Sequence, residues 1–193
     1  MKNAILVHGW ADKQEFYNPK YPTASNSHWF PWLTKQLMIK DIYTVAPEMP
    51  KGYYPEYEIW KNEFERFDIN KETLLVGHSC GGGFLVRWLT ENSERKVGKV
   101  VLVAPWMGIH FNEEPFDDSF FSFEIRRDIA QQTTGLYIFN STDDMEVVQQ
   151  SVKILRNQVD NVQYREFTGK GHFTLSSLGT EEFPELLEEL LSS

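Results

Sequence analysis

The sequence predicts an α/β protein, a three-layer α/β/α sandwich with a mostly parallel sheet of about five or six strands. Short apolar runs recur along the chain, and several lack polar alternation, which is typical of strands buried on both faces. Segments with helical spacing separate these runs, and repeated strand–helix–strand units favour a parallel sheet with right-handed crossovers. Its 193 residues are 41% hydrophobic and contain no repeat or Gly/Ser linker, which predicts a single domain over residues 1–193.

The predicted strands are short and mostly rich in Val, Ile, Leu or Phe. In chain order they are Ala4–Val7, Ile42–Ala46, Thr73–Val76, Val100–Ala104, Leu136–Phe139 and Val162–Phe167. All six are of ordinary strand length, and helical patterns lie between most of them. They are therefore expected to lie in one sheet.

The predicted helices carry apolar residues three and four positions apart, so each presents one apolar face. They are Trp29–Ile39, Pro55–Phe67, a helix from near Cys80 through Phe84–Leu89, Glu146–Val159 and Phe183–Leu191. Their stripes include Trp29, Trp32, Leu33 and Leu37, then Tyr57, Trp60, Phe64 and Phe67, then Val147, Val148, Val152, Leu155 and Val159. Pro55 suits the first turn of its helix. These faces are expected to pack on the sheet.

The segment Pro105–Thr134 interrupts this alternation, because it holds no clear strand and is rich in aromatic residues. A connection of about thirty residues is long for a compact domain, and such connections often form lids or binding loops. Two interpretations stand side by side: one or two helices that cover a sheet edge, or a wall of the substrate site. On the second interpretation Trp106 and Met107, with Trp10, shape an acyl pocket.

Composition excludes several classes of function. The net charge of −9 repels a phosphate backbone, so nucleic acid is not an expected partner. Cys80 is the single cysteine, which excludes an internal disulfide and a cysteine zinc site, and no metal or cofactor is predicted. No apolar run is long enough to span a membrane, and Ala4–Val7 is too short for a signal-peptide core. We therefore expect a cytoplasmic protein without a membrane partner.

The strongest chemical signal is Gly77-His78-Ser79-Cys80-Gly81, a Gly-x-Ser-x-Gly motif between a predicted strand and a predicted helix. A serine there projects its hydroxyl only if the turn is sharp, and the flanking glycines let neighbouring backbone pass without Cβ clashes. The backbone N–H of Cys80 then lies at a helix N-terminus, where it can stabilise an oxyanion. Ser79 is thus the candidate nucleophile.

A serine hydroxyl needs a base, and the base needs an orienting acid. In the order expected for a strand–turn–helix nucleophile, the acid follows a later strand and the histidine follows the last one. His172 follows the predicted strand Val162–Phe167, and Asp143 and Asp144 follow Leu136–Phe139. The two adjacent carboxylates leave two choices of acid, and the other aspartate is expected to cap the following helix.

The loop after the first predicted strand is expected to supply the second oxyanion donor. The backbone N–H of Trp10 or of Ala11 is the candidate, and Trp10 is preferred. His8 lies on the wrong strand for a base, so we expect it to hold this loop through hydrogen bonds. His78 is expected to be structural.

Taken together, these motifs resemble the α/β-hydrolase superfamily. Val7-His8-Gly9, Gly77–Gly82, Ser141–Asp144 and Gly171-His172-Phe173 occur in the order and spacing of that superfamily. More narrowly, with its His28–Leu33 segment, the chain resembles small serine hydrolases of the retinoblastoma-binding-protein type and bacterial predicted esterases. Cys80 departs from the commoner Leu, Met or Ser, and without a Leu-x-Cys-x-Glu segment retinoblastoma-protein binding is not expected.

The resemblance implies a minimal α/β-hydrolase fold without a large cap domain. It also implies that Ser79 is the nucleophile, His172 the base and Asp144, rather than Asp143, the acid. The resulting hypothesis is a serine hydrolase, a carboxylesterase that cleaves a small-molecule ester through a Ser-His-Asp triad and an acyl-enzyme intermediate. The alternatives are a thioesterase or amidase of the same fold, or a binding protein on a hydrolase scaffold. No protein partner is specified.

Overall fold

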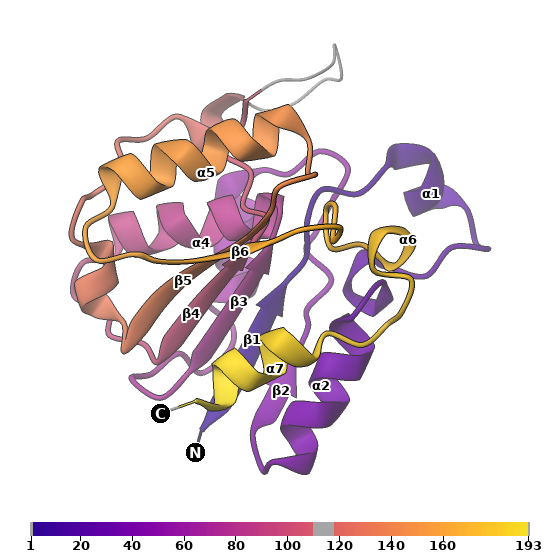
Figure 1. Ribbon diagram of the computed structural model, residues 1–193, viewed down its shortest axis with the longest axis horizontal. Helices are drawn as coiled ribbons and strands as arrows, with labels where there is room; N and C mark the ends of the chain where they lie inside the picture. Colours follow the sequence, from indigo (N-terminus) through magenta and orange to yellow (C-terminus); the bar gives the residue numbers. More distant parts are fainter. Residues whose placement is uncertain (1, 110–117, 193) are drawn as a thin grey trace.

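The computed structural model describes residues 2–109 and 118–192 and contains a six-stranded parallel sheet of order β2-β1-β3-β4-β5-β6 (Figure 1). Its strands are β1 (Asn3–Val7), β2 (Tyr43–Val45), β3 (Leu74–His78), β4 (Lys99–Val103), β5 (Gly135–Ser141) and β6 (Gln163–Phe167). Every recorded strand pair is parallel. This arrangement confirms the predicted sandwich and the parallel sheet.

Helices cover both faces of the sheet. They are α1 (Lys13–Tyr17), α2 (Phe30–Ile39), α3 (Tyr57–Phe64), α4 (Cys80–Glu91), α5 (Glu146–Gln158), α6 (Leu175–Leu178) and α7 (Pro184–Leu191). The chain runs outward from β1 to β2 and in the opposite direction from β3 to β6, so right-handed crossovers put α2 on one face and α4 and α5 on the other. Helix α7 lies beside α2 (Figure 1).

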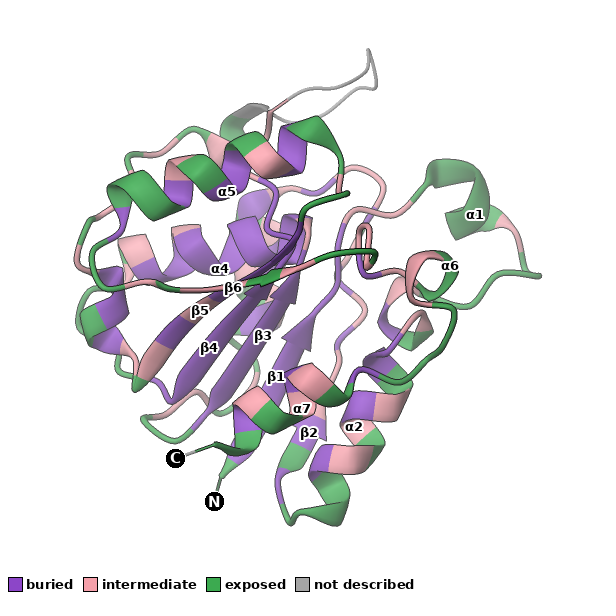
Figure 2. Cartoon of the chain, in the orientation of Figure 1, coloured by how far each residue is buried: buried purple, intermediate pink, exposed green. Residues whose placement is uncertain are grey.

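The central strands carry the core. All five residues of β1, of β3 and of β4 are buried, and the strands appear as a continuous buried band in Figure 2. By contrast, β2 and β6 lie at the sheet edges and keep exposed residues, so burial on both faces holds only for the inner strands. Trp29, Trp60 and Trp88 are completely buried. Each large apolar side chain buried in this way stabilises the fold by roughly 1.5–3 kcal/mol.

Most element boundaries agree with the sequence predictions to within two residues. Strand β3 extends past Val76 to His78, because parallel pairing with β4 continues to Val103. Helix α3 is shorter than the predicted Pro55–Phe67 and ends at Phe64. Helices α1 and α6 were not predicted; they are only five and four residues long and bury no side chain.

In the long connection between β4 and β5, the described part contains two short 3₁₀ helices, Asp118–Phe121 and Ile129–Gln132. They agree with the interpretation of one or two short helices in this segment. Phe111 and Phe116 lie outside the described residues. No helix in the described part of the chain is long and apolar enough to cross a membrane.

The parallel sheet brings distant loops to one edge. Strands β1, β3, β5 and β6 end at Val7, His78, Ser141 and Phe167, and the carboxyl ends of parallel strands share one edge. The loops that follow them carry Trp10, Ser79, the two adjacent aspartates and His172. Fold alone therefore gathers the residues of the candidate site.

Candidate active site

Ser79 forms the turn between β3 and α4, where its backbone has φ +52° and ψ −119°. A non-glycine residue in this region is strained and persists only when its surroundings hold it there. The Ser79 N–H donates to Val103 O at 2.9 Å, and the Trp106 N–H donates to Ser79 O at 3.0 Å. Ser79 is partly exposed, so this strained turn presents its hydroxyl at the sheet edge.

Glycines around the turn allow backbones to approach each other. A Cβ on Gly81 would lie 2.3 Å from Val7 O, and a Cβ on Gly77 would lie 2.5 Å from Gly81 O. Neither backbone oxygen can move out of the way, so only glycine fits. The prediction that Gly77 and Gly81 permit close passage is confirmed. A Cβ on Gly9 would also lie 2.9 Å from the Ser79 Cβ, which places the loop after β1 directly against the serine.

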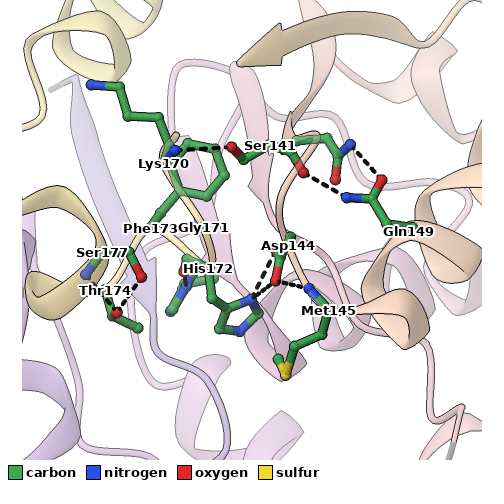
Figure 3. A network of polar contacts seen from close by, with 12 residues as sticks. Ser141, Asp144, Met145, Gln149, Lys170, Gly171, His172, Phe173, Thr174 and Ser177 are labelled. Carbon is green, nitrogen blue, oxygen red and sulfur yellow. Dashed lines mark hydrogen bonds and ion pairs between the residues drawn. The ribbon is translucent and has the colours of Figure 1, made fainter. Parts of the chain in front are cut away.

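His172 and Asp144 meet across two loops. His172 Nδ1 lies 3.0 Å from both carboxylate oxygens of Asp144 (Figure 3). The Asp144 side chain is fully buried and that of His172 is 19% exposed, so the contact is shielded from water. An Nδ1–H that donates to a carboxylate leaves Nε2 as the accepting nitrogen of the neutral ring. The Met145 N–H also donates to Asp144 Oδ1, at 2.7 Å.

Asp143 points the other way. Its carboxylate accepts hydrogen bonds from the Ser141 hydroxyl at 2.5 Å and from the Gly169 N–H at 2.9 Å and the Gly171 N–H at 3.3 Å. These donors, the Ser141 hydroxyl first, hold the pKa of Asp143 below its usual value. The prediction that one aspartate caps the following helix is wrong, because α5 begins after Met145 with no side-chain cap. Asp143 instead braces the loop that carries His172.

The main chain at His172 is fixed from the opposite side by two buried rings. His78 Nε2 donates to His172 O at 2.8 Å, and Trp29 Nε1 donates to Phe173 O at 3.0 Å. Burial, followed by the neighbouring histidine rings, holds the pKa of His78 well below its usual value, so His78 stays neutral. These contacts agree with the structural role expected of His78.

His8 anchors the loop after β1, as expected. The Met49 N–H donates to His8 Nε2 at 2.8 Å, which makes Nε2 an acceptor, and Nδ1–H then donates to Gly9 O at 2.7 Å. Burial lowers the pKa of His8, consistent with this neutral ring. His8 lies beneath the loop and is only 1% exposed, so it is unsuited to exchanging a proton with a ligand.

The N–H groups of Trp10 and Cys80, the predicted oxyanion donors, have no backbone acceptor within the described part of the chain. The alternative donor, the Ala11 N–H, is already bonded to Gly52 O at 3.0 Å. The Cys80 side chain is fully buried, and burial raises the pKa of its thiol, so the residue contributes its backbone rather than a reactive sulfur.

A cavity of about 310 Å³, here called the Ser79 pocket, opens beside the serine. Ser79, His172 and Trp10 line it together. The rest of its wall comes from the segment between β1 and the start of α2, which includes α1, from the loop after β2, from the end of β3 and from the loop after β6: His8, Gly9, Ala11, Asp12, Glu15, Phe16, Tyr21, Pro22, Thr23, Ala24, Ser27, His28, Phe30, Glu48, His78 and Thr174. This volume lies at the small end of the range for ligand sites.

The structure does not place Trp106 and Met107 on the wall of the Ser79 pocket. Trp106 is 8% exposed and its Nε1 donates to Ile109 O, while its backbone holds Ser79. Met107 lines a different hollow, next to Phe121 and Ile125. Among the described residues, no three His, Cys, Asp or Glu side chains are grouped so that they could hold a metal ion.

Comparison with known proteins shows which family the chain belongs to. The model of the serine hydrolase family matches residues 4–192. The chain belongs to the serine hydrolase family. This serine hydrolase is 27% identical to the protein YdeN of Bacillus subtilis strain 168 over 99% of its own length and 95% of that protein.

Solved structures show the same fold. The crystal structure of the ydeN gene product superposes on this serine hydrolase with a TM-score of 0.78 at 23% identity, covering 98% of this chain and 97% of that one. An α/β serine hydrolase homologue from Coxiella burnetii gives 0.59 at 19% identity, covering 98% and 83%. The fold is therefore that of an α/β hydrolase.

Sequence reasoning missed three groups of this serine hydrolase's site: the bracing carboxylate of Asp143, the indole of Trp29 and the wall supplied by residues 12–28. Trp29 was assigned only to an apolar helical face, although it immediately follows His28, whose Nδ1 accepts from the Leu175 N–H at 3.1 Å. The conspicuous His-Trp-Phe-Pro-Trp segment was the available signal.

Proposed function

We propose that this serine hydrolase cleaves small carboxylic esters through an acyl-enzyme, with Ser79 as nucleophile, His172 as base and Asp144 as the orienting acid. The observation that carries the proposal is the buried contact between His172 Nδ1 and both Asp144 oxygens, on a loop that borders the same pocket as Ser79. Nε2 is then the nitrogen available to the serine hydroxyl.

The reaction proceeds in two steps, acylation and deacylation of Ser79. The Ser79 oxygen attacks the ester carbonyl while His172 Nε2 accepts its proton, and the same proton passes to the departing alcohol as the acyl-enzyme forms. Water then attacks the acyl carbonyl, giving its proton to His172, which returns it to Ser79 as the acid leaves. The amides of Trp10 and Cys80 donate to the tetrahedral oxyanion in both steps; loss of one such donor costs about 3–4 kcal/mol in comparable sites.

The test is labelling with a fluorophosphonate, which phosphonylates only an activated serine. We expect the wild-type protein to be labelled at Ser79, and the Ser79→Ala variant to be neither labelled nor active on p-nitrophenyl acetate. Ser27→Ala is the matched control, because Ser27 lines the same pocket and its hydroxyl donates to the backbone oxygen Thr23 O. Equal labelling of wild type and Ser79→Ala would refute the proposal. Parallel thioester and anilide substrates distinguish an esterase from a thioesterase or amidase.

A further inference from the structure

The Ser79 pocket has an electrostatic bias. Carboxylates of Asp12, Glu15 and Glu48 lie on its wall, and none of its described lining residues is a lysine or arginine. Burial lowers the pKa of His28, and it does the same for His8 and His78. These three rings therefore add no positive charge to the pocket. The charge facing the pocket is therefore negative.

Glu48 is the innermost of these carboxylates, with a side chain 30% exposed. Its Oε2 accepts the Ser25 N–H at 2.8 Å, and its Oε1 lies 3.7 Å from His8 Nε2. That nitrogen already accepts the Met49 N–H and carries no proton to share, so it does not neutralise the carboxylate. Oε1 is buried without a hydrogen-bond donor in the described structure.

A partly buried carboxylate without a basic partner is unfavourable for the free protein. Its position gives it an effect on the reaction site. Glu48 Oε1 lies 3.7 Å from His8 Nε2, the next residue, Gly9, lies against Ser79, and Glu48 and Ser79 line the same pocket. A concave wall of low dielectric constant concentrates such a field in the pocket.

Aromatic rings complete the wall. Trp10, Phe16 and Tyr21 line the same pocket, and Phe16 and Tyr21 are 40% and 51% exposed. The faces of aromatic rings attract cations, and an organic ammonium group combines positive charge with apolar surface that such rings can cover. Carboxylate charge together with accessible rings favours an alkylammonium group over an anion or a purely apolar group.

We propose that the substrates of this site are small esters that carry a protonated amine, and that Glu48 determines this preference. The inference rests on the proposed esterase function. A pocket of about 310 Å³ leaves room for the amine only within a few bonds of the scissile ester. The net charge of −9 also favours the approach of cationic substrates.

Isosteric ester pairs isolate the charge. The alcohol-side pair is 2-(dimethylamino)ethyl acetate and its neutral isostere 3-methylbutyl acetate. The acyl-side pair is ethyl 3-(dimethylamino)propanoate and ethyl 4-methylpentanoate. Tertiary amines are used because they are protonated at pH 7 and cannot form an amide with their own acyl group. We expect kcat/KM for the cationic member of at least one pair to exceed that of its isostere by about tenfold or more at low ionic strength, and this ratio to fall as salt is added.

Glu48→Gln removes the charge but keeps an oxygen to accept the Ser25 N–H, so a purely structural Glu48 would leave the ratio unchanged. We expect the ratio to fall toward one. Glu182→Gln, an exposed position away from the pocket, changes the net charge equally and should leave the ratio as in the wild type. If Glu48→Gln does not fold, the wild-type ratio is measured at increasing salt concentration. A ratio that falls supports an electrostatic preference, and a ratio that stays constant contradicts it.

The outcomes separate the two proposals. If the neutral esters are hydrolysed and Ser79 is labelled, but neither pair shows a cationic preference or Glu48→Gln retains it, the amine specificity is overturned and the esterase remains. If no ester is hydrolysed and Ser79 is not labelled, both are overturned.

Discussion

At the scale of single residues, two neighbouring aspartates of the same chemical type have different surroundings. The Asp144 side chain is completely buried against His172, while Asp143 is exposed and accepts backbone amides of the loop that carries His172. The turn after β5 points successive side chains in different directions, one toward the ring and one toward its loop. The orientation of this turn, rather than the intrinsic acidity of either residue, distinguishes them.

Asp144→Asn should lower kcat by about 10⁴-fold, because an amide does not hold the imidazole in the tautomer that leaves Nε2 as acceptor. Asp143→Asn retains one accepting oxygen for the loop and should cost about tenfold or less. Steady-state hydrolysis of p-nitrophenyl acetate by both variants, each checked for folding by circular dichroism, measures the difference. If Asp143→Asn were the more impaired, the acid would be Asp143.

At the scale of elements, the unit formed by β3, the serine turn and α4 depends on close packing against β1. Helix α4 begins immediately after Ser79, and Gly81 allows its first turn to lie against the backbone of Val7 and His8. Such close packing needs both Gly81 in α4 and the fixed backbone of β1 opposite it. The serine turn is thus held by an element that lies about seventy residues earlier in the chain, and tertiary contacts of this kind can override local preference.

Gly81→Ala should destabilise the protein by about 1–3 kcal/mol or prevent folding, because the added methyl group meets backbone that cannot withdraw. The midpoint of urea unfolding measures the loss. A variant with wild-type stability would show that α4 can shift away from β1 without cost.

Helix α7 is attached to the sheet by Lys99 at the start of β4. This lysine is 6% exposed, and its Nζ donates to Glu189 O at 2.6 Å and to Ser192 O at 3.1 Å. It therefore satisfies carbonyls in the last turn of the helix, which lack donors within the helix itself. The contact ties the C-terminal helix to the central sheet.

Lys99→Met should lower the free energy of unfolding by about 1–3 kcal/mol, because the carbonyls lose a charged donor while the methionine fills similar space. In this variant, amide hydrogen exchange should accelerate, relative to the wild type, more in α7 than in β1. An equal change of the exchange rate in both elements would mean that Lys99 does not anchor the helix.

At the scale of the whole molecule, buried neutral histidines couple folding to pH. His8 and His78 are 1% and 3% exposed, and burial lowers the pKa of each in the folded protein below 6.5, its ordinary value. The unfolded chain therefore binds protons at a higher pH than the folded protein does. Their stabilising contribution is fully present above about pH 6.5 and is lost progressively as the pH falls below it.

Urea unfolding between pH 7.5 and 5.5 should show a free energy that decreases with falling pH, by at most about 1.4 kcal/mol per pH unit for each histidine. His78→Gln removes one of these groups and should reduce the slope. A slope identical to that of the wild type would indicate that His78 is not held neutral by the fold.

Local sequence patterns were sufficient to predict most of the sheet and its helices. Period-two and period-3.6 patterns reflect which side chains must be buried, and the short apolar runs and the stripe of α5 were recognised for that reason. Helices α1 and α6 could not be recognised, because they bury no side chain and leave no periodic pattern. The glycines around Ser79 were informative because a serine at a strand–turn–helix junction is typically flanked by glycines at both sides.

Contacts between distant loops were decided only by the tertiary structure. The sequence by itself determined the parallel α/β fold and a serine at a sharp turn, since both follow from local sterics and periodic burial. It left the adjacent aspartates unresolved, and of the pocket residues Trp10, Trp106 and Met107 offered by one interpretation, only Trp10 lines the Ser79 pocket, whose wall comes mostly from the segment between His8 and Phe30. Which side chains meet there depends on how strand order brings loop ends together, and short-range patterns carry no information about such long-range contacts.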